Sequence, residues 1–312
     1  MFDVLVVGEL NVDIILNQID GFPEVGKEIL AKNFTVTLGS SSAIFASNLS
    51  TLGAKTAFLG KVGDDQFADL IHSSLNRKKV DTGYVFRSAE LKTGSTIVLN
   101  YGMDRANVTY PGAMESLTER DVRDDILTSA GHMHVSSVFL QPGIKQNLIR
   151  LFQRAKSFGL TTSLDPQWDP FEKWDIDLEG LLPYVDVFLP NRKELMCLTN
   201  TKTVDDGINA IREFANVLAV KDGENGAILC HNGVITKIEA FLNEDVADCI
   251  GAGDSFDAGF ISQFIKGVPL KECLKFANLA GAVNTTRSGG TTAFESLDTV
   301  KQIASERFSY SI

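Results

Sequence analysis

Short apolar runs of strand length alternate along most of the chain with stretches whose apolar residues recur at helical spacing. The strand-like runs lie at residues 4–7, 56–59, 132–138, 161–164, 187–189, 217–220 and 227–229, and the helix-like stretches at residues 42–52, 146–158, 204–214 and 255–266. This alternation is typical of βαβ units, which form a mostly parallel sheet covered by helices on both faces. We therefore predict an α/β fold.

Two early segments interrupt this rhythm. Residues 13–37 and 93–112 alternate over short distances and contain Gly and Pro, but they show no convincing helix. Within the second segment, residues 96–101 and 106–110 flank a turn near residues 102–104, a pattern that predicts a β-hairpin. Because no low-complexity linker or fixed-period repeat occurs, we predict one domain over residues 1–312 with a small β-sheet inserted.

The charges and the cysteines exclude several classes of protein. The chain has 29 Lys and Arg against 40 Asp and Glu, with no basic block, so nucleic acid is not an expected partner. The four cysteines are widely spaced, which indicates neither a disulfide framework nor a zinc site. The apolar runs are far shorter than a membrane-spanning helix, and the N-terminus lacks the pattern of a signal peptide. We expect a cytoplasmic protein with no membrane partner.

The most informative stretch is a glycine-rich turn that opens a predicted helix. Gly251, Ala252, Gly253 and Asp254 come directly before the helix-like stretch 255–266. Amide groups at a helix start lack intrahelical partners and lie at the positive end of the dipole, so small residues there let a phosphate approach. A carboxylate among these donors can accept a hydroxyl proton during phosphoryl transfer. The simpler alternative is that Asp254 caps the helix and the glycines form a tight turn.

The longer run at residues 248–260 reads Asp-x-x-Gly-Ala-Gly-Asp-x-Phe-x-Ala-Gly-Phe and resembles the C-terminal signature of the ribokinase-like (PfkB) carbohydrate kinases. The resemblance implies a three-layer α/β/α fold with a small β-sheet lid, contributed by about residues 13–37 and 93–112. It also implies ATP-dependent phosphorylation of a hydroxymethyl group on a small sugar or sugar-like acceptor, with Mg²⁺. The family's catalytic base then falls on Asp254, and its anion hole on the amides of Gly251, Ala252 and Gly253.

Further elements of the family pattern follow one another in the expected order. The resemblance places the acceptor near Asp13, Gly39, Ser40, Ser41 and Arg105, and the nucleotide near Asn191, Glu194, Lys221, Gly223, Gly226 and Asn278. It places Glu194 near magnesium, and Asp248 with the carbonyl of Ile250 at a monovalent-cation site that suits potassium. Each residue also has a structural alternative: Asn191 and Glu194, for example, have the spacing of a capping box.

Two departures from the family pattern leave the acceptor open. Ser40 stands where a second glycine is usual, and Ile44 stands where an asparagine commonly helps to fix sugar hydroxyls. Residues 165–170 lack the Asp-x-Asn-x-Arg pattern of members that phosphorylate keto-deoxy sugar acids or fructose, which argues against a sugar-acid acceptor. Within the class, a nucleoside kinase is the closest alternative.

Two other classes of function have weaker support in the sequence. A dinucleotide-binding oxidoreductase would need a GxGxxG motif after the first strand, and residues 8–11 lack it. A non-catalytic sugar-binding protein that kept the fold would have no need of an intact Asp254 and its glycine turn.

The exposed edge of a small lid sheet is a liability unless it is covered, which predicts a homodimer through the lid.

Overall fold

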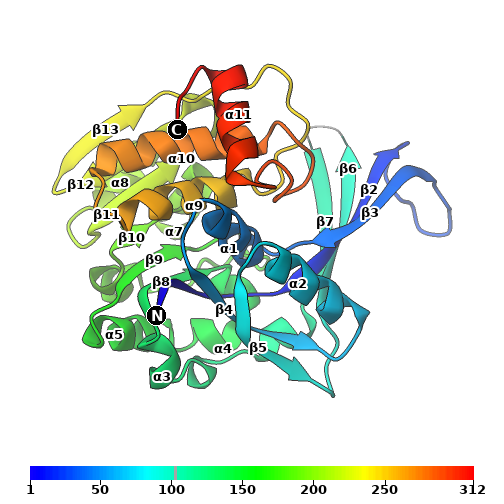
Figure 1. Ribbon diagram of the computed structural model, residues 1–312, viewed down its shortest axis with the longest axis horizontal. Helices are drawn as coiled ribbons and strands as arrows, with labels where there is room; N and C mark the ends of the chain where they lie inside the picture. Colours follow the sequence, from blue (N-terminus) through cyan, green and yellow to red (C-terminus); the bar gives the residue numbers. More distant parts are fainter. Residues whose placement is uncertain (102–103) are drawn as a thin grey trace.

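The computed structural model describes residues 1–101 and 104–312, without the side chains of Asp104 and Arg105. Over these residues its centre is a nine-stranded sheet in the order β13-β12-β11-β10-β9-β8-β1-β4-β5 (Figure 1). The strands are β1 (Phe2–Val7), β4 (Thr56–Gly63), β5 (Asp81–Ser88), β8 (Ala130–Ser136), β9 (Thr161–Asp165), β10 (Val187–Phe188), β11 (Val217–Lys221), β12 (Ala227–His231) and β13 (Val234–Ile238). Neighbouring strands run parallel except in the pairs β11–β12 and β12–β13, which are antiparallel.

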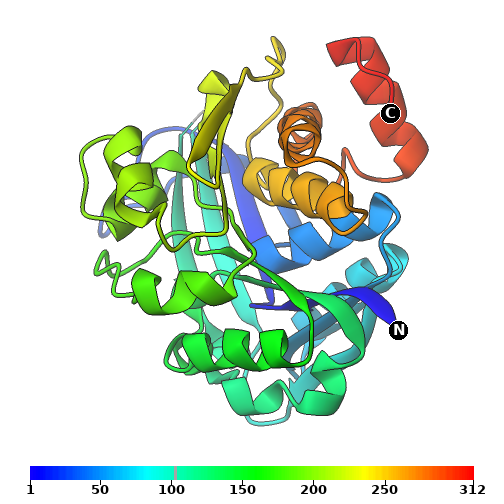
Figure 2. The same ribbon diagram turned by 90° about the vertical axis from the view of Figure 1, so that its left-hand side faces the viewer.

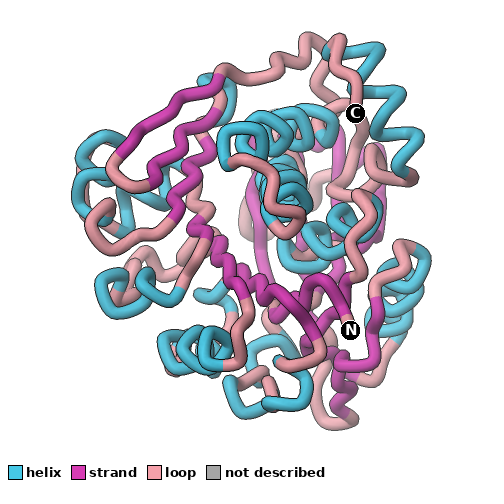
Figure 3. The backbone as a smooth tube through the Cα atoms, turned by 60° about the vertical axis from the view of Figure 1, so that its left-hand side comes forward, coloured by secondary structure: helices cyan, strands magenta, loops and turns pink. Residues whose placement is uncertain are grey.

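Helices cover both faces of this sheet (Figures 2 and 3). One face carries α1 (Ser41–Thr51), α2 (Gln66–Arg77), α9 (Ala252–Phe264), α10 (Leu270–Asn284) and α11 (Leu297–Phe308). The other carries α3 (Asp124–Leu127), α4 (Pro142–Lys145), α5 (Leu148–Ser157), α6 (Leu178–Leu181), α7 (Arg192–Leu198) and α8 (Val204–Ile211). Strand β1 shows why two covering layers are required: Val4 and Val6 pack into one apolar core, and Leu5 and Val7 pack into the other. The predicted three-layer fold is confirmed.

A second sheet, here called the lid, lies to one side of the three layers (Figure 1). Its strands, in spatial order, are β3 (Ala31–Leu38), β2 (Asn11–Ile19), β6 (Gly94–Tyr101) and β7 (Asp104–Tyr110). Side chains alternate along each strand, so the register puts Asp13 beside Thr96 on one face and Ile14 beside Ile97 on the other. The predicted small β-sheet is confirmed. Among the helices of the described residues, none has both the length and the apolar character needed to cross a membrane.

The order of the strands reverses at β1. From β1 the sheet extends through β4 to β5 in one direction and through β8 and β9 to β11 in the other. Ligands of open parallel sheets bind beyond the carboxyl ends of the strands at such a reversal. Glu9 follows the end of β1, Ser137 follows β8 and Gln167 follows β9. We therefore expect the functional site at this edge of the sheet.

Candidate active site

The glycine turn opens helix α9. Gly251 is its N-cap with a φ of 75°, and a Cβ atom on this residue would lie 2.7 Å from the Cα of Gly290. The left-handed backbone and the close contact both require glycine at this position. The first helical hydrogen bond runs from the Ser255 N–H to the Gly251 carbonyl at 2.8 Å. The amides of Ala252 and Gly253 precede it, at the positive end of the helix dipole, where an anion is stabilised.

The sequence pattern placed Asp254 directly before the helix. In the structure it lies in the first turn of α9, because the helix already begins at Ala252. Gly251 takes the N-cap position, so the alternative in which Asp254 caps the helix does not hold. The Asp254 side chain is mostly buried, and its Oδ1 accepts hydrogen bonds from the Ser41 Oγ at 2.5 Å and the Gln167 Nε2 at 3.1 Å. Ser41 starts α1 and Gln167 follows β9, so three elements that are distant in the sequence meet at this carboxylate.

A cavity of about 690 Å³ adjoins the turn and is lined in part by the polar face of the lid. Its lining includes five of the residues predicted for catalysis and acceptor binding, which are Asp13, Ser40, Ser41, Gly251 and Asp254. Gly39 packs against Asp13, because a Cβ atom on this glycine would lie 2.2 Å from the Asp13 Oδ1. The side chain of Arg105, also predicted at the acceptor, lies outside the described residues. The structure thus gathers the described acceptor residues around one cavity.

One part of this cavity is apolar and aromatic. Trp168 and Phe171 follow β9, Phe139 follows β8, and all three line the cavity. Trp168 is 39% exposed, so its ring is accessible to a ligand. Ile44 extends the apolar lining to the glycine turn, where a Cβ atom on Gly290 would lie 2.4 Å from the Ile44 Cδ1. A hydrocarbon side chain therefore lines the cavity at the position where the family pattern predicted an asparagine.

A second cavity, of about 300 Å³, adjoins the same turn. Its lining includes four residues that the sequence assigned to the nucleotide, which are Lys221, Gly223, Gly226 and Asn278. Ala252 and Gly253 also line this cavity, whereas Gly251 and Asp254 line the first one. The start of α9 therefore stands between two cavities. This arrangement suits the transfer of a group from one bound ligand to another.

A buried ionic cluster lies next to the turn. The Lys221 Nζ is 2.9 Å from the Asp165 Oδ2 and 3.1 Å from the Asp257 Oδ2, and both carboxyl groups are almost fully buried. Burial alone would lower the pKa of Lys221, but the charges of the two acids raise it. Burial would raise the pKa of Asp165, but the charge of Lys221 holds this pKa below its usual value. For Asp257, burial and the charge of Asp165 raise the pKa well above its usual value. Lys221 is therefore the cation of this cluster and Asp165 its anion, and Asp257 is the carboxyl group that more readily holds a proton.

Asn191 and Glu194, predicted near the phosphates and magnesium, form a capping box at the start of α7. The Asn191 N–H donates to the Glu194 Oε2 at 2.8 Å, and the Glu194 N–H donates to the Asn191 Oδ1 at 2.9 Å. Burial, together with the charge of Asp165, raises the pKa of Glu194 to about 8. Neither residue is among the described residues that line the two cavities, so the structural alternative is present and the cofactor role stays a prediction.

Asp248 and Ile250, predicted at a monovalent-cation site, lie in the loop before α9. The Asp248 Oδ2 accepts hydrogen bonds from the Ser288 Oγ at 2.6 Å and the Gly289 N–H at 2.9 Å. The Ile250 carbonyl accepts a hydrogen bond from the Asn284 Nδ2 at 2.6 Å. The first two bonds tie the loop before α9 to residues 288 and 289, and the third ties it to the end of α10. Potassium binding stays a prediction.

Two residues of the site were not predicted from the sequence. Gln167 contacts Asp254, and the signal that could have found it is its position two residues after Asp165, where the family's Asp-x-Asn pattern has its Asn. Glu9 lines the acceptor cavity and accepts hydrogen bonds from the backbone N–H and the hydroxyl of Ser42. Burial raises the pKa of Glu9 to about 7. Its position directly after the first strand was the available signal.

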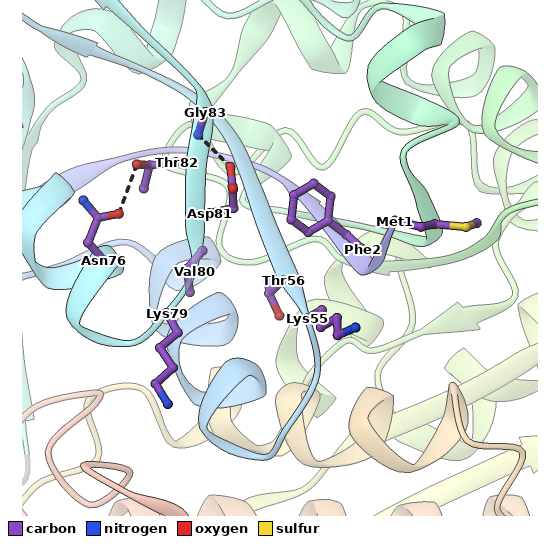
Figure 4. A pocket seen from close by; sticks show the side chains of 10 residues that line it. All are labelled: Met1, Phe2, Lys55, Thr56, Asn76, Lys79, Val80, Asp81, Thr82 and Gly83. Carbon is purple, nitrogen blue, oxygen red and sulfur yellow. Dashed lines mark hydrogen bonds between the residues drawn. The ribbon is translucent and has the colours of Figure 1, made fainter.

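Another hollow, of about 700 Å³, lies among the labelled side chains of Figure 4. It is lined by residues at the amino ends of three strands, such as Phe2, Thr56 and Asp81. Ligands of parallel sheets bind at the carboxyl ends instead. The Asp81 carboxylate accepts a hydrogen bond from the Gly83 N–H at 2.8 Å, which serves the local turn. This hollow includes none of the predicted site residues, and it is not a candidate active site.

Comparisons with known proteins agree with this geometry. The family model for pfkB family carbohydrate kinases matches residues 1–297. The 2-dehydro-3-deoxygluconokinase of Bacillus subtilis is 27% identical over 97% of this chain and 94% of the relative. The ATP-dependent ribose-1-phosphate kinase of Halopiger xanaduensis is 28% identical over 99% of this chain and 100% of the relative. The structure of Arabidopsis thaliana ribokinase complexed with ribose and ATP matches with a TM-score of 0.83 at 25% identity, covering 96% of this chain and 98% of that chain.

Proposed function

The chain belongs to the pfkB family of carbohydrate kinases, and we propose that it transfers the γ-phosphoryl group of ATP to a hydroxymethyl group on a small sugar or sugar-like acceptor. The observation that carries the proposal is the start of α9, which two cavities share. ATP would occupy the cavity lined by Lys221 and Asn278, and the acceptor the cavity lined by Asp13 and Ser41. The two ligands would meet at Asp254.

Asp254 is the proton acceptor in this proposal. The acceptor hydroxyl oxygen forms a bond to the γ-phosphorus of ATP while the bond from that phosphorus to the β–γ bridging oxygen breaks, and ADP leaves. The hydroxyl proton passes to the Asp254 carboxylate. The amides of Gly251, Ala252 and Gly253 donate toward the negative charge of the transferring group, and the helix dipole acts in the same direction. Closure of the lid would exclude water and limit hydrolysis of ATP.

Two cations complete the proposal. Magnesium supplies positive charge next to the phosphates when it is bound with ATP, and Glu194 is the carboxylate that the family pattern offers to it. The described residues include no group of three or more His, Cys, Asp or Glu side chains placed to hold a metal. Potassium would lie at Asp248 and the Ile250 carbonyl. Equal turnover in potassium, sodium and choline chloride would remove the monovalent cation from the proposal.

A nucleoside is the second candidate acceptor because of the aromatic lining. A planar base could stack on Trp168 while the hydroxyls of its sugar face Asp13 and Asn11 on the lid. A single pentose or hexose would use the polar lining and leave much of the aromatic surface uncovered. Trp168→Leu separates the two candidates, because it should weaken a nucleoside substrate far more than a free sugar.

The test is an acceptor panel with the purified protein, ATP and magnesium. Pentoses, hexoses, deoxysugars, sugar acids and nucleosides are supplied at equal concentrations, and ADP release is compared with a reaction without acceptor. Coupling of the product phosphorus to two methylene protons in ³¹P NMR identifies phosphorylation of a hydroxymethyl group. We expect at least one panel member to raise ADP release well above the background. ADP release that no acceptor stimulates would overturn the proposal.

A homodimer through the lid is also part of the proposal. The outer lid face presents exposed apolar side chains at Phe34, Ile97, Val108 and Tyr110, and the strand register places them on the face opposite Asp13. A second copy of the lid would cover this surface. We expect light scattering at micromolar concentration to give twice the mass of one chain, and Val108→Lys to give the mass of one chain. A wild-type protein with the mass of one chain would contradict the dimer.

A further inference from the structure

Gln167 contacts both the proposed base and the buried ionic cluster. Its Nε2 lies 3.1 Å from the Asp254 Oδ1, 2.6 Å from the Asp165 Oδ2 and 2.8 Å from the Ser41 Oγ. The Ser41 hydroxyl itself donates to the same Asp254 oxygen at 2.5 Å. One amide nitrogen therefore joins the carboxylate at the cavity to the carboxylate of the cluster.

The chemistry of these neighbours fixes which amide atom faces them. Two carboxylate oxygens and a hydroxyl whose proton is already directed to Asp254 are all acceptors, so the nitrogen of Gln167 and not its oxygen has to face them. The nitrogen carries two hydrogens. One is directed to Asp165, and the other lies toward Ser41 and Asp254. Both hydrogens are used to hold negatively charged groups in place.

The backbone of Gln167 is held in an unusual conformation. Its φ is 59°, in the left-handed region that a residue with a Cβ atom rarely adopts. Its N–H lies within 3.4 Å of the Asp165 Oδ1, and Pro166 separates the two residues. Disfavoured backbone conformations persist where the surrounding structure imposes them, and they gather at functional sites. Here the conformation places the amide between two carboxylates.

We infer that Gln167 is a positioning residue for Asp254, because its amide orients this carboxylate for proton transfer and separates it from Asp165. The inference rests on the proposed function, since it concerns the same base. Without the donor, two carboxylates would face each other across the space that the amide fills, and their repulsion favours protonation of one of them. Loss of a donated hydrogen bond acts in the same direction. As the pH is lowered, a variant without the donor should therefore lose activity at a higher pH than the wild type does.

A pH profile also reports on the other charged and titratable groups around Asp254. They come from each neighbouring element and are Asp257 on α9, Asp165 on β9, Lys221 on β11, Glu194 on α7, and Glu9, Asp13 and Glu115, which line the acceptor cavity. Helix α1 contributes none of these groups. A substitution at Gln167 leaves all of them in the chain. A difference between two profiles then reports on the group at position 167, and the neutral Gln167→Asn separates the loss of the amide contacts from the carboxyl group that Gln167→Glu adds.

Two variants of Gln167 test the inference, with one matched control. Gln167→Glu keeps the size of the side chain but replaces the donor with an acceptor. Gln167→Asn suits the left-handed backbone but shortens the reach of the amide. Gln263→Glu makes the same chemical change further along α9, where the amide donates to Ser262 and contacts no residue of the site. Thermal melting shows which variants are folded.

We expect the acidic side of the kcat/KM profile to move up by at least one pH unit in Gln167→Glu and by a smaller amount in Gln167→Asn. Gln263→Glu should keep the wild-type profile, and the Kd for ATP should stay within about threefold in all variants. A Gln167→Glu enzyme with the wild-type profile would overturn the inference. Should Gln167→Glu fail to fold, the same two measurements on Gln167→Asn, the profile and the titration below, decide whether Gln167 positions Asp254.

The second measurement does not depend on turnover. The ¹³C resonance of the Asp254 carboxyl group, assigned by its loss in Asp254→Asn, is titrated in the absence of ligands. Its titration midpoint should rise by at least one pH unit in Gln167→Glu. Identical midpoints in the two proteins would overturn the inference even if the kinase activity is present. A protein that phosphorylates no acceptor but shows the shift would instead refute the proposed function and leave the role of Gln167 standing.

Discussion

Lys221 is the cation of the buried cluster, and replacing it with Met tests how that cluster contributes to stability. Lys221→Met removes the charge while it keeps much of the side-chain volume. The Nζ lost in this change lies 2.9 Å from Asp165 and 3.1 Å from Asp257, which are 0% and 1% exposed. Removing one partner of a buried ion pair costs about 3–5 kcal/mol, because the other charge is left without compensation. We predict a loss of this size in the free energy of unfolding at pH 7.

The loss should depend on pH. Lys221 lowers the pKa of Asp165 in the folded protein, so the pair contributes stability that is present above the unfolded pKa of about 4. This contribution disappears as the pH falls through the lower folded value. The difference between the wild type and Lys221→Met should therefore be full at pH 7 and should shrink toward pH 3.

Urea unfolding followed by circular dichroism and tryptophan fluorescence provides the assay. Lys221→Met/Asp165→Asn also removes the anion, so it should be more stable than Lys221→Met by at least about 1 kcal/mol. Asp257→Asn replaces the carboxyl group that more readily holds a proton, so it should cost no more than about 1 kcal/mol. A Lys221→Met protein within about 1 kcal/mol of the wild type, or a double variant that recovers nothing, would refute this assignment of charges.

Two further predictions concern Glu9 and the glycine turn. Burial raises the pKa of Glu9 from 4.5 to about 7, so the folded chain holds this proton more tightly and its stability should fall by about 3 kcal/mol as the pH rises through that range. Urea unfolding at pH 4.5 and pH 8 should show a smaller fall for Glu9→Gln, and parallel curves would contradict the burial argument. Gly251→Ala and Gly267→Ala share a φ near 75°, but only a Cβ atom at position 251 meets a neighbour, 2.7 Å away at Gly290. Both variants should lose about 1 kcal/mol in the free energy of unfolding, because the left-handed backbone disfavours alanine. Gly251→Ala alone should lose more stability than this and at least tenfold in kcat. An equal loss of kcat in the two variants would count against the anion hole.

The central strands could be predicted from the sequence because burial on both faces leaves continuous apolar runs. β1 is an example, with Val4, Leu5, Val6 and Val7 all fully buried. Strands β5 and β13 lie at the two edges of the sheet, where exposed and half-buried residues alternate irregularly and charged residues interrupt the apolar ones. The lid was predictable for another reason. One of its faces is polar and the other apolar, which produces the alternation at residues 13–37 and 93–112.

The candidate site also has features that could be predicted from the sequence and features that could not. The glycine turn was predictable because its function depends on backbone amides at a helix start, and four consecutive residues encode that arrangement. The contacts of Asp254 with Ser41 and Gln167 were not predictable, because they join residues 213 and 87 positions apart. The ion pairs of Lys221 likewise depend on how β9 and β11 lie beside α9. Spacing alone did indicate the capping box of Asn191 and Glu194, since both of its partners are local.

The central claim is that Asp254 accepts the proton of the acceptor hydroxyl, and Asp254→Asn tests it most directly. The amide keeps the size of the side chain but cannot accept the proton. Asp257→Asn, one turn further along α9, is the matched control. With the best acceptor of the panel, kcat should fall by about 100- to 10,000-fold in Asp254→Asn while the Kd for ATP changes little. Near-normal turnover in Asp254→Asn would contradict the account.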